Sequence, residues 1–243
     1  MPIIKFYPTD DVIGGFAPAP IPAATQVPEW FRKLSPYQSD NKSIVKGDDG
    51  DNPHSGYFLN TTAKKCMAMI DTFTTGYYFL CPVDIYFDTT DEDNIQIKWK
   101  NTQYTFILTH SEEQTGNYPL DESFCKQSFR WVPYWMTTTP PGYSTLFTQP
   151  FHRLDLPFIT TPGVIDTDEM PSAGALPFNI KKGFKGIIKR GTPIAQAIPF
   201  KRESWEHKIV DNRPQEVIDK LNLISAQFTG SYKDHMWERK AYK

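Results

Sequence analysis

The sequence predicts a mainly β protein, a distorted barrel or sandwich with peripheral helices that include a C-terminal helix. Three observations predict this class. The 243 residues hold 21 prolines against 14 glycines, which favours short bounded strands and extended segments over long helices. Runs of aromatic and β-branched residues recur between turn residues from about residue 77 to residue 200. Helical spacing of apolar residues is clearest after Pro214.

Composition narrows the class of protein. Aromatic residues make up 14% and charged residues 22% of the chain, which is ordinary for one folded domain with its own core. The formal net charge of −2 gives no overall basic field, so a nucleic-acid partner is not expected. The three cysteines, Cys66, Cys81 and Cys125, form no Cys-x-x-Cys pair. They are therefore expected to be small apolar core residues in a reducing compartment rather than zinc ligands.

The chain shows no signal for a membrane. No stretch approaches the roughly eighteen apolar residues of a transmembrane helix. Residues 1–6 lack the charged and apolar regions of a signal peptide. We therefore expect no membrane partner, and a location in the cytoplasm where the chain is made or in a particle assembled there.

The first segment, residues 1–60, is expected to be an extended proline-rich arm with one short helix. Pro18, Pro20 and Pro22 favour extended backbone, and Pro28 is placed to begin a helix. Trp30 and Phe31 follow Pro28. Their rings either bury against their own chain or anchor the arm to a partner, and we name them as partner-binding residues.

The second segment, residues 61–210, is expected to be the β-rich core. Residues 63–73 predict a short helix at its start, with four apolar residues on one side: Cys66, Met69, Ile70 and Phe73. Alternating or continuous apolar runs then predict strands, and Pro140-Pro141-Gly142 predicts a turn. The expected strands are 77–81, 83–87, 95–100, 104–108, 124–136, 143–147, 158–165, 176–180, 184–189 and 194–200.

The third segment, residues 211–243, is expected to be helical. Pro214 suits a first helical turn, and apolar residues recur at helical spacing until Gly230, which is expected to end the helix. Residues 231–243 add a second, basic turn. Two interpretations stay open: a helix that packs on the core, or an arm that reaches a neighbouring subunit. The apolar positions are Val217, Ile218, Leu221, Ile224 and Phe228.

Three segments carry the functional signal, residues 141–153, 161–168 and 191–196. Gly163 permits a tight bend, and Val164 and Ile165 are expected to anchor a strand in the core. Asp166 then projects a carboxylate from the strand end, where a water molecule can be oriented and deprotonated.

In order and spacing these segments resemble dUTPases and dCTP deaminases. That superfamily carries a turn and strand before a serine-bearing phosphate loop, then a Gly-Val-Ile-Asp motif and a Gly-x-x-Ile-Ala-Gln motif. Here the two motifs are Gly163–Asp166 and Gly191–Gln196. The resemblance implies the dUTPase-like (β-clip) fold and, because dUTPases are trimers, a homo-oligomer. It also implies that Asp166 orients water and that Arg153, Asp166, Asp168 and Gln196 bind a ligand.

The chain departs from that family at the positions that act on dUTP. Glu169 stands where the family carries an aromatic residue that stacks on uracil, and residues 148–153 lack the phosphate-orienting serine. The glycine-rich C-terminal arm is also missing. Binding and positioning supply most of the rate in phosphate chemistry, so dUTPase activity is not expected.

The whole chain is also similar to an uncharacterised family of marine bacteriophages and bacteria. This second resemblance implies a phage or phage-related origin, without implying an activity. It rests on residues 76–84, 139–143, 163–168 and 198–203.

Two charged clusters leave alternatives open. Asp166, Asp168 and Glu169 form either a weak divalent-cation site or a solvated turn, and no other cofactor or metal is expected. The basic residues between Lys181 and Arg190, followed by Lys201 and Arg202, form either a solvated strand face or a surface for nucleic acid or an acidic protein face.

These observations favour a non-enzymatic structural or binding protein. We expect it to be phage-encoded and to join other copies of itself or virion proteins, in the host cytoplasm and then in the virion. The alternative is a nucleotide- or small-anion-binding protein, or a hydrolase of the dUTPase-like superfamily that uses Asp166.

Overall fold

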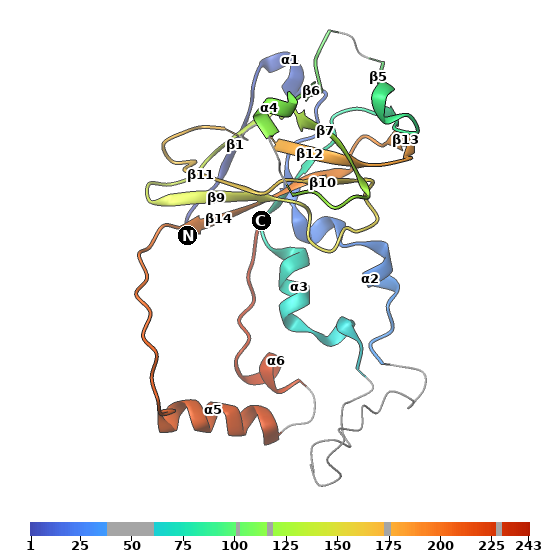
Figure 1. Cartoon of the computed structure of the whole chain (residues 1–243). Helices are drawn as coiled ribbons and strands as arrows, with labels where there is room; N and C mark the ends of the chain where they lie inside the picture. Colours follow the sequence, from blue (N-terminus) through green and yellow to red (C-terminus); the bar gives the residue numbers. More distant parts are fainter. Residues whose placement is uncertain (38–60, 101–102, 116–118, 173–175, 227–229) are drawn as a thin grey trace. The chain divides into compact units, whose positions relative to one another are not determined.

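A computed structural model describes residues 1–37, 61–100, 103–115, 119–172, 176–226 and 230–243 (Figure 1). The chain divides into two compact units that interleave along the sequence. Unit 1 comprises Met1–Thr25, Thr75–Glu203 and Tyr242–Lys243, and unit 2 comprises Gln26–Thr74 and Ser204–Ala241. These limits do not coincide with the expected segments, because the start of the expected arm pairs with the strands of unit 1. The rest of that arm, residues 38–60, lies outside the described residues.

Unit 1 is built mainly from β-strands, which confirms the predicted mainly β class. Within the described residues the strands form open sheets in the orders β1-β8, β10-β12-β7-β6, β11-β9-β14-β3-β2 and β13-β4-β5, and none closes on itself. The short helices in or bordering this unit are α1 (Asp11–Gly14), η1 (Ala23–Gln26), η3 (Glu92–Asn94) and α4 (Glu112–Thr115). The strands are β1 (Lys5–Pro8), β2 (Ile21–Pro22), β3 (Tyr77–Leu80), β4 (Ile85–Asp88), β5 (Gln96–Trp99), β6 (Ile107–Thr109), β7 (Phe124–Trp131), β8 (Trp135–Thr138), β9 (Tyr143–Thr148), β10 (Phe158–Thr160), β11 (Gly163–Ile165), β12 (Leu176–Lys181), β13 (Lys185–Ile188) and β14 (Pro193–Lys201).

Two expected strands are each divided in two. The run 124–136 forms β7 and β8, and the run 158–165 forms β10 and β11, with the halves in different sheets. Pro133 and Pro162 lie between the halves. Proline has no N–H to give to a ladder, so each strand ends there and the chain crosses to another sheet.

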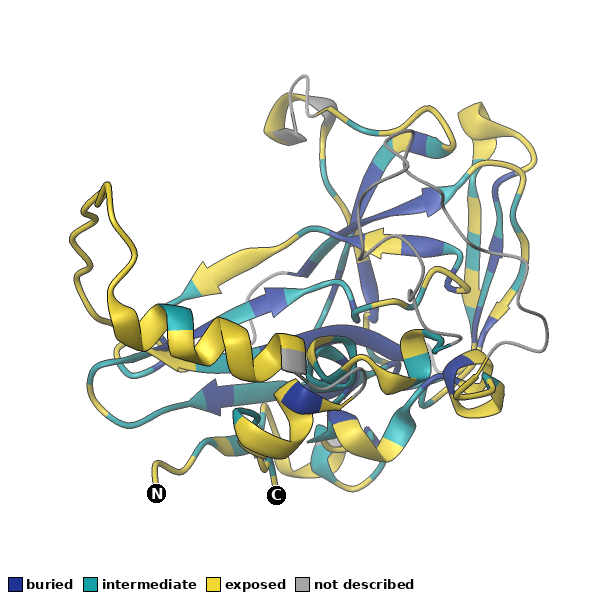
Figure 2. Ribbon diagram, turned by 90° about the horizontal axis from the view of Figure 1, so that it is seen from below, coloured by how far each residue is buried: buried dark blue, intermediate teal, exposed yellow. Residues whose placement is uncertain are grey.

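The core of unit 1 is rich in aromatic rings, and its strands carry most of the buried residues in Figure 2. Trp131 of β7 stacks on Phe178 of β12 with ring centroids 4.0 Å apart. Phe158 and Phe129 meet the same Phe178 ring from β10 and β7. Aromatic pairs of this kind stabilise a core beyond the area they bury, so the four-stranded sheet is joined through side chains as well as backbone.

The cysteine prediction holds for two of three residues. Cys81 and Cys125 are buried in the core of unit 1, and burial raises the pKa of the Cys81 thiol to about 12. Cys66 is exposed, which corrects the expectation that it is a core residue. It follows the 3-10 helix η2 (Ala63–Lys65) in an extended conformation, and only Phe73 of the expected apolar side is buried.

Unit 2 is helical where it is described. It contains α2 (Glu29–Lys33), η2, α3 (Met67–Thr74), α5 (Gln215–Ala226) and α6 (Ser231–His235). Pro28 is the N-cap of α2, and Phe31 packs on Phe73 of α3 with ring centroids 4.4 Å apart. The Asp71 carboxylate of α3 accepts hydrogen bonds from Trp237 Nε1 and Lys240 Nζ, which ties the C-terminal segment to α3.

Gly230 has a different place from the expected one. It is the N-cap of α6 in a left-handed conformation, with φ +82°, and α5 ends at Ala226. Residues 227–229, including the expected apolar Phe228, lie outside the described residues.

Gly76 lies where the backbone leaves no room for a side chain. Its φ is +73°, and a Cβ there would lie 2.1 Å from the Ala197 carbonyl oxygen on β14. We expect Gly76→Ala to cost about 1–2 kcal/mol of left-handed strain and about 1–3 kcal/mol of overpacking, measured by urea unfolding.

Gly142→Ala is the matched control for this prediction. Gly142 has φ +83°, but beyond its two chain neighbours no described atom lies within 4 Å of the place that its Cβ would occupy. The control should therefore lose only the part that comes from left-handed strain. Equal losses in the two variants would contradict this account.

Candidate functional site

The ends of three neighbouring strands bring polar residues together in unit 1. β9 pairs with β11 on one side and with β14 on the other. Ile165 lies opposite Thr145, so Asp166 follows beside Ser144. Lys201 lies opposite Tyr143, so Arg202 follows beside Gly142. The antiparallel register therefore places Asp166, Ser144 and Arg202 at one end of these strands, and the turn after Asp166 brings Asp168 to the same end.

Asp168 is the most enclosed carboxylate of this cluster, with a side chain only 2% exposed. Arg202 holds it with both ends of its guanidinium group, Nη1 donating to Oδ1 at 2.6 Å and Nη2 to Oδ2. The Gly142 backbone N–H donates to Oδ2 at 2.7 Å. These charge-assisted bonds, above all those from Arg202, lower the pKa of the Asp168 carboxyl from 3.8 to about 2.

Asp166 is held from one side and open on the other. The Ser144 hydroxyl donates to Oδ1 at 2.6 Å, and Arg202 Nη1 lies 3.3 Å from the same oxygen. The Asp166 side chain is nevertheless 59% exposed. Val164, two residues earlier, is also exposed, which corrects the expectation that it anchors β11 in the core. β11 is an edge strand, so one of its faces meets solvent.

A chain of hydroxyl groups holds the turn between the two aspartates. Thr167 Oγ1 lies 2.8 Å from Thr145 Oγ1 and 2.8 Å from Thr139 Oγ1. Thr139 donates its only hydroxyl proton to the Tyr143 carbonyl oxygen, so it must accept from Thr167. Thr145 then donates to Thr167. The direction of every proton is set, and the turn is anchored to β9.

The other two expected ligand-binding residues lie elsewhere in unit 1. Arg153 makes a two-point ion pair with Asp155, with distances of 2.8 and 2.9 Å. Gln196 is fully buried, donating to the Thr75 carbonyl and accepting from the Phe151 N–H. Gln196 and Arg202 are separated along the same chain segment by about 20 Å, because an extended strand rises about 3.3 Å per residue. The expected set Arg153, Asp166, Asp168 and Gln196 therefore does not converge.

The acidic cluster offers little to a cation. Asp168 is already occupied by Arg202, and Glu169 is exposed with its N–H bonded to the Asp166 carbonyl. Among the described residues there is no group of three or more His, Cys, Asp or Glu side chains placed to hold a metal ion. A divalent cation would have to bind through Asp166 and its exposed neighbours.

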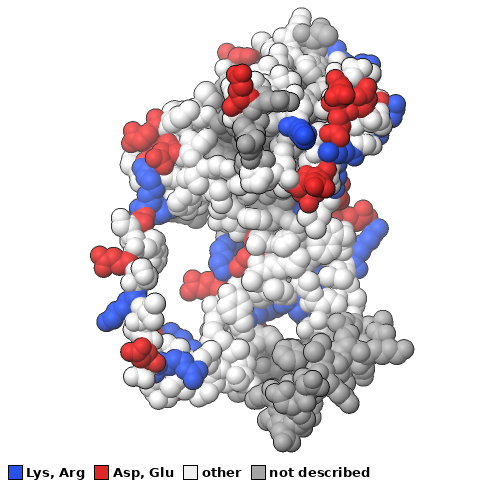
Figure 3. Space-filling model, viewed as in Figure 1, with Lys and Arg blue, Asp and Glu red and all other residues white. Residues whose placement is uncertain are grey.

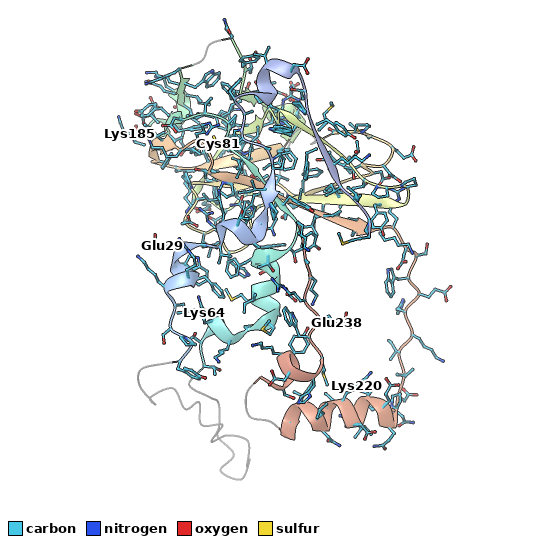
Figure 4. All side chains as sticks on the ribbon, turned by 180° about the vertical axis from the view of Figure 1, so that it is seen from behind. Glu29, Lys64, Cys81, Lys185, Lys220 and Glu238 are labelled. Atoms are coloured by element: carbon cyan, nitrogen blue, oxygen red, sulfur yellow. The ribbon has the colours of Figure 1, made fainter. Side chains whose placement is uncertain are left out.

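Three basic residues in β13 or next to β12 and β13 are paired with acidic residues of the same unit. Lys182 lies 3.2 Å from Glu92, Lys185 2.7 Å from Asp88, and Lys189 3.0 Å from Asp84. Figure 3 shows acidic and basic groups interspersed on the visible face, and Figure 4 labels Lys185 on β13. These pairs neutralise much of the basic cluster that the sequence suggested.

The two expected partner-binding aromatics differ in access. Phe31 is buried in unit 2 against Phe73, and Lys64 Nζ lies 4.8 Å above its ring. The Phe31 ring is therefore packed within its own unit, and its assignment as a partner-binding residue stays a prediction. Trp30 contacts Phe31 and Phe73 edge-on but keeps an exposed face.

Arg202 and Ser144 are the site residues that sequence reasoning misses. The charge of Arg202 and its place after a strand group it with the lysines of 181–190 in the sequence. Its partner Asp168 is 34 residues away, and only the pairing of β9 with β14 brings the two together. Ser144 follows the predicted turn at Gly142, but no local signal shows that its hydroxyl faces Asp166.

Comparison with known proteins adds no family. No model of a protein family matches the chain, and no curated protein matches it. None of the described helices combines the length and apolar character that crossing a lipid bilayer requires. The geometry of the site and the character of the surface are therefore the basis for assigning a function.

Arg202→Gln tests whether the charge on Asp168 is what the pair stabilises. A lowered folded-state pKa gives stability that is present above pH 4 and is lost as the pH falls toward 2. We expect Arg202→Gln to lower the free energy of unfolding at pH 7, and the difference from wild type to shrink between pH 4 and pH 2. Urea unfolding across this range measures it.

Lys201→Gln is the matched control, because Lys201 is an exposed neighbour whose ion pair is with exposed Glu203. It should differ little from wild type at any pH. A pH-independent loss in Arg202→Gln would show that the arginine stabilises the sheet by packing and not through the Asp168 charge.

Proposed function

We propose that this protein is a non-enzymatic structural or binding protein that works within a larger assembly, such as a virion, together with other copies of itself or other virion proteins. One observation carries the proposal. The carboxylates that follow β11 are engaged by side chains of the same sheet: Arg202 and Gly142 hold Asp168, and Ser144 holds Asp166. These hydrogen bonds join the chain after β11 to β9 and to the end of β14.

The chemistry of the two carboxylates supports this proposal. A general base works best with a pKa near the operating pH, whereas the pKa of Asp168 is about 2. Asp168 is also covered by its partners, so it offers no free oxygen to a substrate. Asp166 retains exposed surface, but Arg153 and Gln196 are not beside it to bind or position a phosphate.

The same proposal includes the origin of the fold. We propose that unit 1 derives from a dUTPase-like (β-clip) barrel whose wall has kept its packing and lost its chemistry. The support is that the segments Gly163–Asp168 and Gly191–Gln196 contribute to one sheet, with β9 between them. Under this proposal the chain is phage-encoded, is made in the host cytoplasm and is incorporated into the particle.

A second candidate function is the binding of a nucleotide or another small anion near Asp166, with or without a divalent cation. The observation in its favour is that Asp166 is largely exposed and the Arg202 guanidinium is partly exposed beside it. An anion would have to approach Arg202 from solvent and compete with Asp168 for its N–H groups.

A thermal-shift experiment separates the two functions. We expect dUTP, dCTP, dUMP and inorganic phosphate, each with and without Mg²⁺, to leave the Tm of the wild-type protein unchanged. A ligand at 100 times its Kd would stabilise the fold by about 2.7 kcal/mol, which such a measurement detects. Asp166→Asn and the neighbouring control Glu169→Gln are measured in parallel. A rise in Tm in wild type and Glu169→Gln that is lost in Asp166→Asn would favour the second candidate.

Mass spectrometry of purified phage particles tests the assembly part of the proposal. We expect peptides of this chain in the particle at a stoichiometry comparable with other structural proteins, and resistant to a high-salt wash. A chain found only in the soluble fraction of the infected cell would contradict a role in the virion.

A further inference from the structure

The segment between β14 and α5 leaves large apolar side chains in solvent. Residues 204–213, here called the linking segment, form neither helix nor strand, and every one of them is exposed. Trp205 and Ile209 are 86% and 88% exposed. Figure 2 shows the extended chain that leads into α5 coloured as exposed throughout. Isolated exposed apolar residues are ordinary, but two such large side chains within five residues of an extended segment indicate a binding surface.

The linking segment has the pattern of an unpaired β-strand. In extended backbone, alternate side chains point to opposite sides. Trp205, His207 and Ile209 therefore share one side, and Glu206, Lys208 and the exposed Val210 share the other. Within the described residues, the backbone of 204–213 makes no hydrogen bond to another segment. The segment thus offers a free set of N–H and C=O groups together with one apolar side.

Charge identifies what the linking segment can pair with. If two copies pair as antiparallel strands about a two-fold axis at His207, Glu206 of each copy lies opposite Lys208 of the other. Trp205 then lies opposite Ile209 on the second side. Both kinds of pair are favourable across antiparallel strands.

Neighbouring registers do not satisfy both conditions. A shift of the axis to Glu206 or to Lys208 places like charges opposite each other. A slip by one residue sets apolar side chains opposite charged ones, because it turns one strand over. The sequence of the linking segment therefore favours one register, the one centred on His207.

Helix α5, which begins two residues after the linking segment, carries exposed apolar residues of its own. Val217, Leu221 and Ile224 recur at spacings of four and three residues, and all three are exposed. A helix of twelve residues is marginal in water without packing of its apolar face. A two-stranded ribbon is also marginally stable by itself. We therefore expect the paired strands and α5 to stabilise the interface together.

We infer that the linking segment and α5 bind a second copy of this chain, with the two linking segments paired as antiparallel strands about His207. This inference rests on the proposed function and names the partner and the contact. A two-fold interface is self-complementary, so one short segment is enough to supply both halves.

Charge reversal tests the register directly. Glu206→Lys sets two lysines opposite each other across the strands, and Lys208→Glu sets two glutamates opposite each other. We expect the dimer dissociation constant of each variant to rise about tenfold or more, measured by sedimentation velocity over a concentration series. Both native side chains are exposed, so circular dichroism should show an unchanged fold.

Two restorations make the test specific. An equimolar mixture of the two variants should form heterodimers as tightly as wild type, because every facing pair is then a lysine opposite a glutamate. The double variant E206K/K208E should self-associate like wild type for the same reason. A wild-type chain that stays monomeric, or a mixture no tighter than its components, overturns the inference and means that the segment binds its own chain or a different partner.

Cross-linking gives an independent reading of the axis. In a Cys66→Ser background, which removes the exposed native thiol, His207→Cys should form a disulfide-linked dimer on mild oxidation. Ser204→Cys is the control, since residue 204 faces residue 210 and its own counterpart is far away. Equal cross-linking at both positions overturns the register. Particle mass spectrometry is independent of this result, so the inference can fail while the proposed function stands.

Discussion

The pairing of β9 with two other strands is the constraint on which the site depends. β11 lies on one side of β9 and β14 on the other, although these strands follow it at different distances along the chain. This order brings Asp168 and Arg202 together at one end of the strands. It also lets the hydroxyl groups of Thr139, Thr167 and Thr145 anchor the turn between Asp166 and Asp168. On the other side of β14, Gly76 lets the chain enter β3 at a point where a Cβ would not fit.

The polar residues at these strand ends hold one another in place. A buried carboxylate must be paired with a cation and hydrogen-bonded to remain charged, and Asp168 satisfies both conditions through Arg202 and Gly142. Such a pair stabilises the turn and lowers the pKa of the carboxyl, but it removes the group from acid–base chemistry at neutral pH. The helical unit shows the opposite situation, because α5 and the linking segment keep apolar surface in solvent. The charged groups of the site find their partners within the chain, whereas the apolar side chains of α5 and the linking segment stay exposed.

Much of the fold was predictable because its signals are local. Alternation and turn residues indicated β3, β4, β5, β9 and β12 to β14 within a few residues of their limits. The errors have physical causes. Pro133 and Pro162 divide two apolar runs that look continuous, and Cys66 lies at a break between η2 and α3 instead of inside one helix. Val164 has the composition of a core residue but lies on an edge strand.

Local patterns in the chain were sufficient for the mainly β class, the positions of most strands and the presence of carboxylates after Gly163, because each depends on residues close together in sequence. What those carboxylates contact depends on the folded arrangement. Asp168 meets an arginine 34 residues away, while Arg153 and Gln196 find other partners in the same unit. Strand neighbours and register are set by how the whole core packs. For this reason Arg153 and Gln196, which the motifs indicated as ligands, lie away from Asp166, while Ser144 and Arg202 lie beside it.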